Sequence, residues 1–140
     1  MYNKILVAYD GSEGSKRALE QASHLAKELG SSIIALWVRA SLPHYPETVD
    51  EVEEEREAAN GFSRKITKEI LEYSKKIGID IVADSCSGHP AKTIVDYAKE
   101  NNVDLVVLGH AGHSGLWGHF LGHTADKVSE NAHCSVLIVR

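Results

Sequence analysis

Several features are scarce in this sequence, and each scarcity excludes a class of protein. Only two cysteines are present, Cys86 and Cys134, which are too few for the disulfide framework of a small secreted domain. No apolar run approaches the length of about 20 residues that a membrane-spanning helix needs. The opening stretch MYNKILVAYD is too soon interrupted by Asp10 to be a signal peptide. We therefore expect a cytoplasmic protein.

Basic residues are also in the minority. Lys and Arg number 15 against 20 Asp and Glu, which gives a net charge of −5. The cations are scattered along the chain and form no stripe that would follow a nucleic-acid backbone. Nucleic acid is therefore not an expected partner.

The sequence contains the pattern of an α/β protein. Apolar runs rich in β-branched residues alternate with helical patterns, which predicts parallel β–α–β units within one domain, residues 1–140. The expected strands are residues 5–9, 33–38, 79–83, 105–108 and 136–139. Right-handed crossovers favour a doubly wound, Rossmann-like or flavodoxin-like parallel sheet of five strands in the order 3-2-1-4-5. In that order the first and fourth strands adjoin at the switch point, where such sheets bind ligands.

Helix signals separate the expected strands. The N-terminal signals are Ser12 or Ser15, the capping-box pair Thr48 and Glu51, and Pro90. The C-terminal stops are Gly30 and Gly78, and the last helix is expected over residues 123–131. The apolar line of the long second helix runs through Val52, Ala59, Phe62, Ile66, Ile70, Tyr73 and Ile77. The acidic run over residues 50–57 is interpreted as a solvated helix face.

The segment GHAGHSGLWGHFLGHT, residues 109–124, follows the fourth expected strand. Its Gly109, Gly112 and Gly122 form the pattern G-x2-G-x9-G. Glycine lets a backbone approach a ligand closely, and N–H groups in a loop before a helix bind phosphate. Asp10, past the end of the first strand, offers a carboxylate acceptor to an adenine amino group or a ribose hydroxyl. Together they predict a nucleotide site between strands one and four; the alternative is a mobile surface loop.

The chain resembles the universal stress protein family from end to end. The likeness lies in ILVAYDGSEGSKRAL at the first strand, VVLGHAG after the fourth and CSVLIVR at the last. Nucleotide-binding members of the family carry G-x2-G-x9-G followed by Ser or Thr. The resemblance implies binding of ATP, with or without magnesium, a homodimer that pairs through the C-terminal strand, and a role in stress survival or signalling. Trp37 is expected in the core beside the adenine.

The resemblance also implies which residues form the site. Asp10 and the backbone at Ala8 and Val38 would hold the adenosine, while the motif glycines and the two positions after the last one would surround the phosphates. The candidate set is Ala8, Tyr9, Asp10, Val38, Gly109, His110, Gly112, Gly122, His123 and Thr124.

Two of these positions depart from the family pattern. Ala8 stands where nucleotide-binding members often have proline. His123 stands where the family has Ser or Thr, with Thr124 one place later. The His123 ring either donates to a phosphate oxygen or fills the phosphate site.

The histidines of residues 109–124 allow rival interpretations. Zinc or nickel would use His110, His113, His119 and His123. No conventional zinc spacing is present, and we expect no metal site. HAGH, residues 110–113, matches the HxGH of nucleotidyl transferases, but there the motif follows the first strand.

No general base is positioned by the sequence. We therefore expect no enzyme, and at most slow ATP hydrolysis. The alternative to nucleotide binding is a family member that acts as a protein-interaction module.

Overall fold

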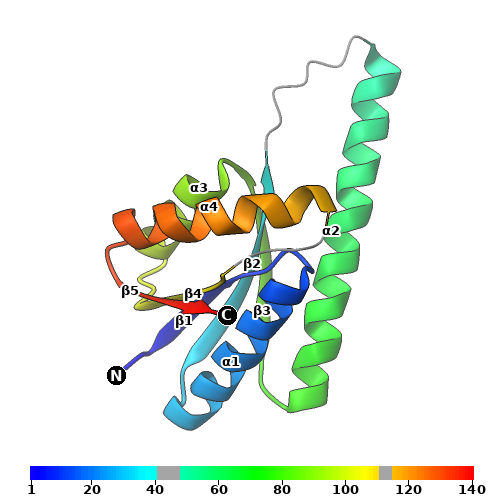
Figure 1. Ribbon diagram of the computed structural model, residues 1–140. Coiled ribbons are helices and arrows are strands. Elements are labelled where there is room, and N and C mark those ends of the chain that lie inside the picture. Colours follow the sequence, from blue (N-terminus) through cyan, green and yellow to red (C-terminus); the bar gives the residue numbers. More distant parts are fainter. Residues whose placement is uncertain (41–47, 111–114) are drawn as a thin grey trace.

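The computed structural model describes residues 1–40, 48–110 and 115–140, and for residues 115–122 the backbone alone. Strands and helices alternate along the chain, as Figure 1 shows. The elements are β1 Lys4–Ala8, α1 Glu13–Leu29, β2 Ser32–Ala40, α2 Val49–Ile77, β3 Ile81–Gly88, α3 Pro90–Glu100, β4 Leu105–Gly109, α4 Gly115–Asn131 and β5 Ser135–Val139.

The strands form one parallel sheet in the order β3-β2-β1-β4-β5, which confirms the predicted topology. β1 and β4 adjoin through pairs such as Ile5 with Leu105, and β3 and β5 are the two edges. The prediction for β3 was wrong in its bounds, because the strand continues through polar residues to Gly88. It does so because β3 pairs with β2 as far as Ala40. The hydrogen bonds between paired strands depend on the partner backbone rather than on side-chain polarity.

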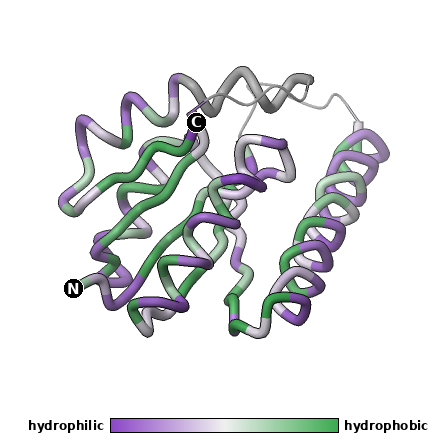
Figure 2. Tube along the Cα trace, turned by 60° about the horizontal axis from the view of Figure 1, so that its bottom comes forward, coloured by the Kyte–Doolittle hydropathy of each residue, from purple (hydrophilic) through white to green (hydrophobic). Residues whose placement is uncertain are grey.

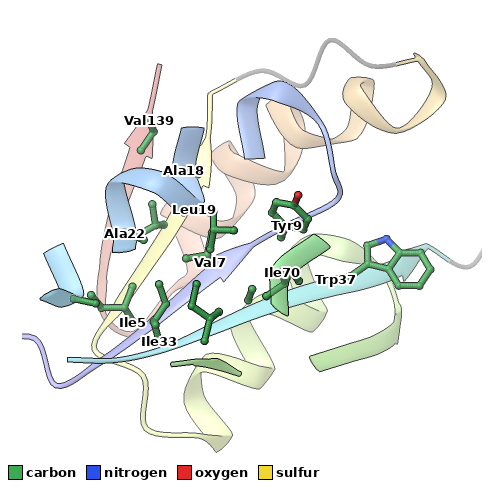
Figure 3. Close-up of a cluster of buried hydrophobic side chains, with 14 of the residues drawn as sticks. Ile5, Val7, Tyr9, Ala18, Leu19, Ala22, Ile33, Trp37, Ile70 and Val139 are labelled. Atoms are coloured by element: carbon green, nitrogen blue, oxygen red, sulfur yellow. The ribbon is translucent and has the colours of Figure 1, made fainter. Parts of the chain in front are cut away.

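The sheet buries a hydrophobic core on each face. Ile5 and Val7 of β1 belong to the core under α1 and α2, which Figure 3 shows in close-up. Leu6 and Ala8 belong to the core under α3 and α4. This division follows from the alternation of side chains along a strand, and most of the strand trace carries the hydrophobic colour in Figure 2. Full burial of a side chain such as Ile5 contributes about 1.5–3 kcal/mol.

The predicted helix ends are confirmed by hydrogen bonds and backbone angles. The Oγ of Ser12 accepts from the backbone N–H of Ser15 at 3.2 Å at the start of α1. The Oγ1 of Thr48 accepts from Glu51 N at 3.1 Å at the start of α2. Gly30 and Gly78 follow α1 and α2 in the left-handed conformation, with φ of 67° and 71°. Pro90 opens α3 as predicted.

The last helix begins earlier than predicted, at Gly115 rather than at His123. Its first turns contain Gly115, Gly118 and Gly122. Glycine is about 1 kcal/mol less favourable in a helix than alanine. The glycine-rich sequence of these turns therefore does not indicate a helix, which is why the predicted start was too late.

The long helix α2 extends past the rest of the domain. Figure 1 shows its first half rising beyond the strands and the other helices. Ile66 and Ile70 in the second half are buried, whereas Val52, on the predicted apolar line, is 37% exposed. The apolar line therefore reaches the core only in the second half of α2.

Long apolar segments and cysteines, both scarce in the sequence, are also few in the part of the structure that is described. None of the described helices combines the length and the apolar character that a membrane span requires. Cys86 lies in β3 at one edge of the sheet, Cys134 precedes β5 at the other, and both are free thiols.

Candidate functional site

A pocket opens where β1 and β2 end, on the sheet face covered by α3 and α4. The open space inside it, including the part open to solvent at its mouth, is about 450 Å³. The described residues that line it are Ala8, Tyr9, Asp10, Leu36, Trp37, Val38, Ala40, Pro90, Ile94 and Thr124. The lining is mainly apolar, and Asp10 and Thr124 are its polar residues.

Asp10 is held by the turn that joins β1 to α1. Its Oδ1 accepts from the backbone N–H of Ser12 at 2.9 Å, and its own N–H donates to the Oγ of Ser15 at 3.3 Å. Gly11 has a φ of +85°, a left-handed conformation that glycine adopts without strain. Among the described residues no donor meets Asp10 Oδ2. The turn therefore fixes the carboxylate and leaves this oxygen available to a ligand.

Tyr9 precedes Asp10, but its side chain lies on the opposite face of the sheet, in the core under α1 and α2 (Figure 3). Its hydroxyl donates to the Oε2 of Glu69 in α2 at 3.1 Å. Burial and the nearby Glu69 carboxylate raise the pKa of the Tyr9 hydroxyl well above its ordinary value. Ile66 and Glu69 also approach Gly11, since a Cβ built there would lie 3.1 and 3.6 Å from them. α2 thus supports the Asp10 turn from the face opposite the pocket.

The end of β4 contacts α1 and β5. Gly109 is buried, and a Cβ at this position would lie 2.8 Å from the carbonyl carbon and oxygen of Gly14. The backbone N–H of His110 donates to the carbonyl of Val139 at 2.7 Å, and the residue is exposed. Packing against α1 therefore requires glycine at position 109, and the His110 amide is already hydrogen-bonded.

His123 and Thr124 occupy different environments on α4. Thr124 is 5% exposed and lines the pocket, whereas His123 is exposed to solvent. Gly122 lies inside α4, where N–H groups beyond the first turn bond within the helix. Of Gly122, His123 and Thr124, the residue that lines the pocket is therefore Thr124.

The entire chain matches the sequence model of one protein family, the "Universal stress protein family", over residues 1–140. The chain belongs to the universal stress protein family. Among its relatives, the universal stress protein YxiE of Bacillus subtilis is 36% identical, with 100% of each chain covered.

Solved structures of universal stress proteins share the fold. UspA from Lactobacillus plantarum superposes with a TM-score of 0.82 at 26% identity, covering 99% of this chain and 98% of that one. The crystal structure of a universal stress protein in complex with cAMP has a TM-score of 0.74 at 28% identity, covering 99% of this chain and 97% of that one.

In this universal stress protein, only some of the predicted site residues line the pocket. The predicted residues that line the pocket are Ala8, Tyr9, Asp10, Val38 and Thr124. Gly109, His110 and His123 do not line it. Gly112 lies outside the described residues, and for Gly122 only the helical backbone is described. Among the described residues that line this pocket none belongs to β4, and the pocket lies over β1 and β2.

Four apolar pocket residues of this universal stress protein were missed by sequence reasoning. Leu36 and Ala40 come from β2, and Pro90 and Ile94 come from the first turns of α3. Leu36 and Val38 are two positions apart in β2, so their side chains share a face of the sheet. That alternation was a usable signal, as was Pro90 directly after β3. Trp37 is 3% exposed, which confirms it as a core residue, and it also lines the pocket, with its ring centroid 5.0 Å from that of Phe62.

The metal interpretation of the histidines is not tested by the structure. Among the side chains that are described, no group of three or more His, Cys, Asp or Glu residues is placed to hold a metal ion. The side chains of His113 and His119 lie outside that set. Because α4 begins at Gly115, His119 and His123 are one helical turn apart.

Proposed function

We propose that this universal stress protein binds an adenine nucleotide, ATP in the first place, in the pocket over β1 and β2 and acts in stress response or signalling. The observation that carries the proposal is a mainly apolar pocket with the fixed carboxylate of Asp10 among its lining residues. Adenine is a flat, largely apolar ring with a polar edge, and such a ring matches apolar walls with a few oriented polar groups. The relative in complex with cAMP supports the choice of an adenine nucleotide.

The walls and the acceptor have separate roles in this proposal. Ala8, Leu36 and Ile94 supply the apolar contact area for the ring. Asp10 Oδ2 accepts a hydrogen bond from the adenine amino group or from a ribose hydroxyl. A guanine bound in the same orientation would place its carbonyl O6, instead of an amino group, against the carboxylate, and these two acceptors repel each other. The same pocket thus favours adenine over guanine if the base edge faces Asp10.

Asp10→Asn is the sharpest variant for testing this role. The amide oxygen keeps the hydrogen bond from Ser12 N, so the turn is retained, while the amide nitrogen replaces the free acceptor by a donor. Isothermal titration with ATP, with and without magnesium, should show a dissociation constant raised about tenfold or more in Asp10→Asn. Glu13→Gln, an exposed carboxyl next to the same turn, is the matched control and should bind ATP as the native chain does.

Absence of ATP, ADP and AMP binding in the native chain would contradict the proposal. That result would favour the alternative, a family member that works as a protein-interaction module. Equal binding of ATP by the native chain and Asp10→Asn would place the nucleotide elsewhere. Equal binding of ATP and GTP would contradict recognition of the adenine amino group by Asp10.

We propose that any ATP hydrolysis is slow. Ser12 and Ser15, the hydroxyls next to Asp10, are both hydrogen-bonded into the start of α1. Their positions fit helix capping rather than attack on a phosphate. Phosphate release under saturating ATP is the measurement, and many turnovers per second would contradict a binding role.

We also propose that the protein is a cytoplasmic homodimer that pairs through β5. β5 is an edge strand beside β4, and Ile138 is 36% exposed. An open edge strand with exposed apolar side chains pairs readily with a second copy. Ile138→Lys should therefore convert the dimer to a monomer in light scattering at salt concentrations that screen surface charges.

The two free thiols support the cytoplasm, a reducing compartment, as the proposed location of the protein.

A further inference from the structure

The two halves of α2 carry net charges of opposite sign, with Arg56 as the cation of the first half and Glu69 and Glu72 as the carboxylates of the second. The acidic side chains of the first half are Asp50, Glu51, Glu53, Glu54, Glu55 and Glu57. The cationic side chains of the second half are Arg64, Lys65, Lys68, Lys75 and Lys76. Gly61 lies near the middle, where the sign changes. A helix charged in this way is complementary to a copy of itself that runs in the opposite direction.

One face of α2 carries this charge pattern at regular spacing. In the second half the face consists of Arg64, Lys68, Leu71 and Lys75, all exposed, and it continues backward through Gly61 to Glu57, Glu54 and Asp50. Successive members are alternately three and four residues apart, which is the spacing of a helix–helix contact line. The buried positions Ile66 and Ile70 face the core. A second helix on the charged face would therefore not compete with the protein's own core.

An antiparallel copy brings opposite charges together along this face. When Gly61 of one copy lies opposite Arg64 of the other, Glu57 lies opposite Lys68 and Asp50 lies opposite Lys75. Glu54 then lies opposite the methylene and methyl groups of Leu71. The contact is two-fold symmetric, so each of these pairs occurs twice.

The monomer leaves this face available. Asp50, Glu54 and Glu57 meet no cation within salt-bridge distance in the described part of the chain. Lys68 makes one exposed contact, with Glu72 at 3.9 Å. Leu71 is 47% exposed, and with Arg64, Lys68 and Lys75 it lines a shallow hollow on the helix. The acidic half stands clear of the strands (Figure 1) and is within reach of another molecule.

We propose that α2 is a self-complementary docking surface, which binds α2 of a second copy of this chain in the antiparallel direction. The acidic run that the sequence analysis assigned to a solvated face is, in this proposal, half of an interface. Exposed ion pairs contribute little individually and are screened by salt. A single helix–helix contact also belongs to the small interfaces, below about 1,200 Å², that form transient complexes. The association is therefore weak and salt-sensitive.

The α2 contact is compatible with pairing through β5. α2 packs against β3 and β2, whereas β5 is the opposite edge of the sheet. The two contacts together would build assemblies larger than a dimer. They differ in salt dependence, because pairing through β5 rests on backbone hydrogen bonds and apolar contacts.

The test uses charge reversal at one proposed pair. Glu57→Lys places Lys opposite Lys68 in a self-pair, and Lys68→Glu places Glu opposite Glu57, so neither variant should pair with itself through α2. A mixture of the two variants restores opposite charges at both symmetry-related positions, and so does the double variant E57K/K68E. Glu28→Lys, an exposed reversal on α1, is the control for net charge.

The measurement is sedimentation velocity at about 20 mM and about 500 mM NaCl, between which the Debye length shrinks several-fold. The native chain and Glu28→Lys should form a larger species at low salt that disappears at high salt. Each single variant should lose that species, with a dissociation constant raised about tenfold or more. The equimolar mixture and the double variant should regain it.

Two outcomes would overturn the proposal. One is a native chain whose sedimentation coefficient does not change with salt or concentration. This includes a native chain that stays monomeric and binds only an added basic peptide through its acidic half, because the partner is then not a second copy. The other is a salt-sensitive species that survives in both single variants, or that the mixture fails to restore. Neither outcome depends on nucleotide binding, which the titration with ATP decides separately.

Discussion

A Cβ atom on Gly109 would lie 2.8 Å from both the carbonyl carbon and the carbonyl oxygen of Gly14, so the end of β4 is in direct backbone contact with α1. This contact positions the first turn of α1, and with it the Asp10 turn, against the centre of the sheet. A glycine that the family motif suggests for phosphate binding thus has a packing role that is visible without any ligand.

Gly109→Ala should therefore destabilise the protein. Neither Gly109 nor Gly14 has a side chain that could move aside, so one backbone must shift, and overpacking of this kind costs about 1–3 kcal/mol. Urea unfolding measures the loss. Gly61→Ala is the control, because a Cβ there meets nothing closer than Arg64 at 3.8 Å, and it should stabilise α2 by about 0.5–1 kcal/mol. An unchanged midpoint for Gly109→Ala would show that α1 can move away at no cost.

Thr124 and His123 should differ in their effect on ATP binding. Thr124 lines the pocket, so Thr124→Val, which keeps the shape and removes the hydroxyl, should raise the dissociation constant about fivefold to tenfold. His123 is exposed, so His123→Ser should change it by less than about twofold. Titration calorimetry compares the two variants. Markedly tighter binding by His123→Ser would instead show that the ring occupies the phosphate site.

The Tyr9 hydroxyl makes the protein sensitive to alkaline pH. Its pKa is raised in the folded state by burial and by Glu69. Tyrosine in the unfolded chain ionises first, so the contribution of Tyr9 to stability is complete below about pH 10 and is lost as the pH rises further. The free energy of unfolding should fall above that pH by at most about 1.4 kcal/mol per pH unit for this group.

Tyr9→Phe tests this origin of the alkaline loss. The variant should be less stable at neutral pH by about 1–3 kcal/mol, because Glu69 loses the donor of its hydrogen bond. Its stability should then fall less steeply above about pH 10 than that of the native chain. Tyr97→Phe should also reduce the loss of stability at alkaline pH, since burial and Asp84 raise the pKa of Tyr97 as well. Parallel curves for the native chain and Tyr9→Phe would contradict the assignment.

Asp104 ties the segment before β1 to the start of β4. Its two carboxylate oxygens accept from the backbone N–H groups of Asn3 and Lys4 at 2.8 and 2.9 Å. Burial raises the pKa of this carboxyl, but these hydrogen bonds outweigh burial and lower it. Its contribution to stability is therefore present above the ordinary carboxyl pKa and is lost as the pH falls through the lowered value.

Asp104→Ala should lower the free energy of unfolding at pH 7 by about 0.5–1.5 kcal/mol, a modest effect because the contact is partly exposed. The difference from the native chain should shrink as the pH falls through the lowered pKa of Asp104, because the native carboxyl then takes up its proton. Chemical denaturation at pH 7 and at acidic pH measures this. Asp80→Ala, an exposed carboxyl before β3, is the control, and an equal loss there would indicate a general charge effect.

The sequence predicted the local elements well where a specific residue has one physical role. Ser12 and Thr48 cap helices through their hydroxyls, Gly30 and Gly78 end helices in a conformation that other residues avoid, and Pro90 opens a helix. The alternation of apolar runs also predicted the parallel sheet and its order. These features depend on neighbouring residues and on the chirality of crossovers, both of which can be inferred from sequence.

The candidate site could be predicted only in part. Asp10, Ala8 and Val38 are at the ends of recognisable strands, so their position in the pocket followed from topology. Ile94 and Thr124 reach the pocket because of how α3 and α4 lie on the sheet, and no sequence pattern specifies that arrangement. His110 was assigned to the site, but its amide is bonded to Val139, a residue of another strand.

The sequence by itself determined the α/β class, the strand order, the helix ends and the position of Asp10 after β1, because each depends on the conformation and polarity of short segments. The tertiary structure decided that β3 continues to Gly88, that the pocket lies over β1 and β2, and that the second half of α2 covers the core while the first does not. It also decided that Gly109 packs against Gly14. These outcomes depend on which backbones and side chains from distant segments come into contact, and packing density and hydrogen bonding set those contacts only when the chain is folded.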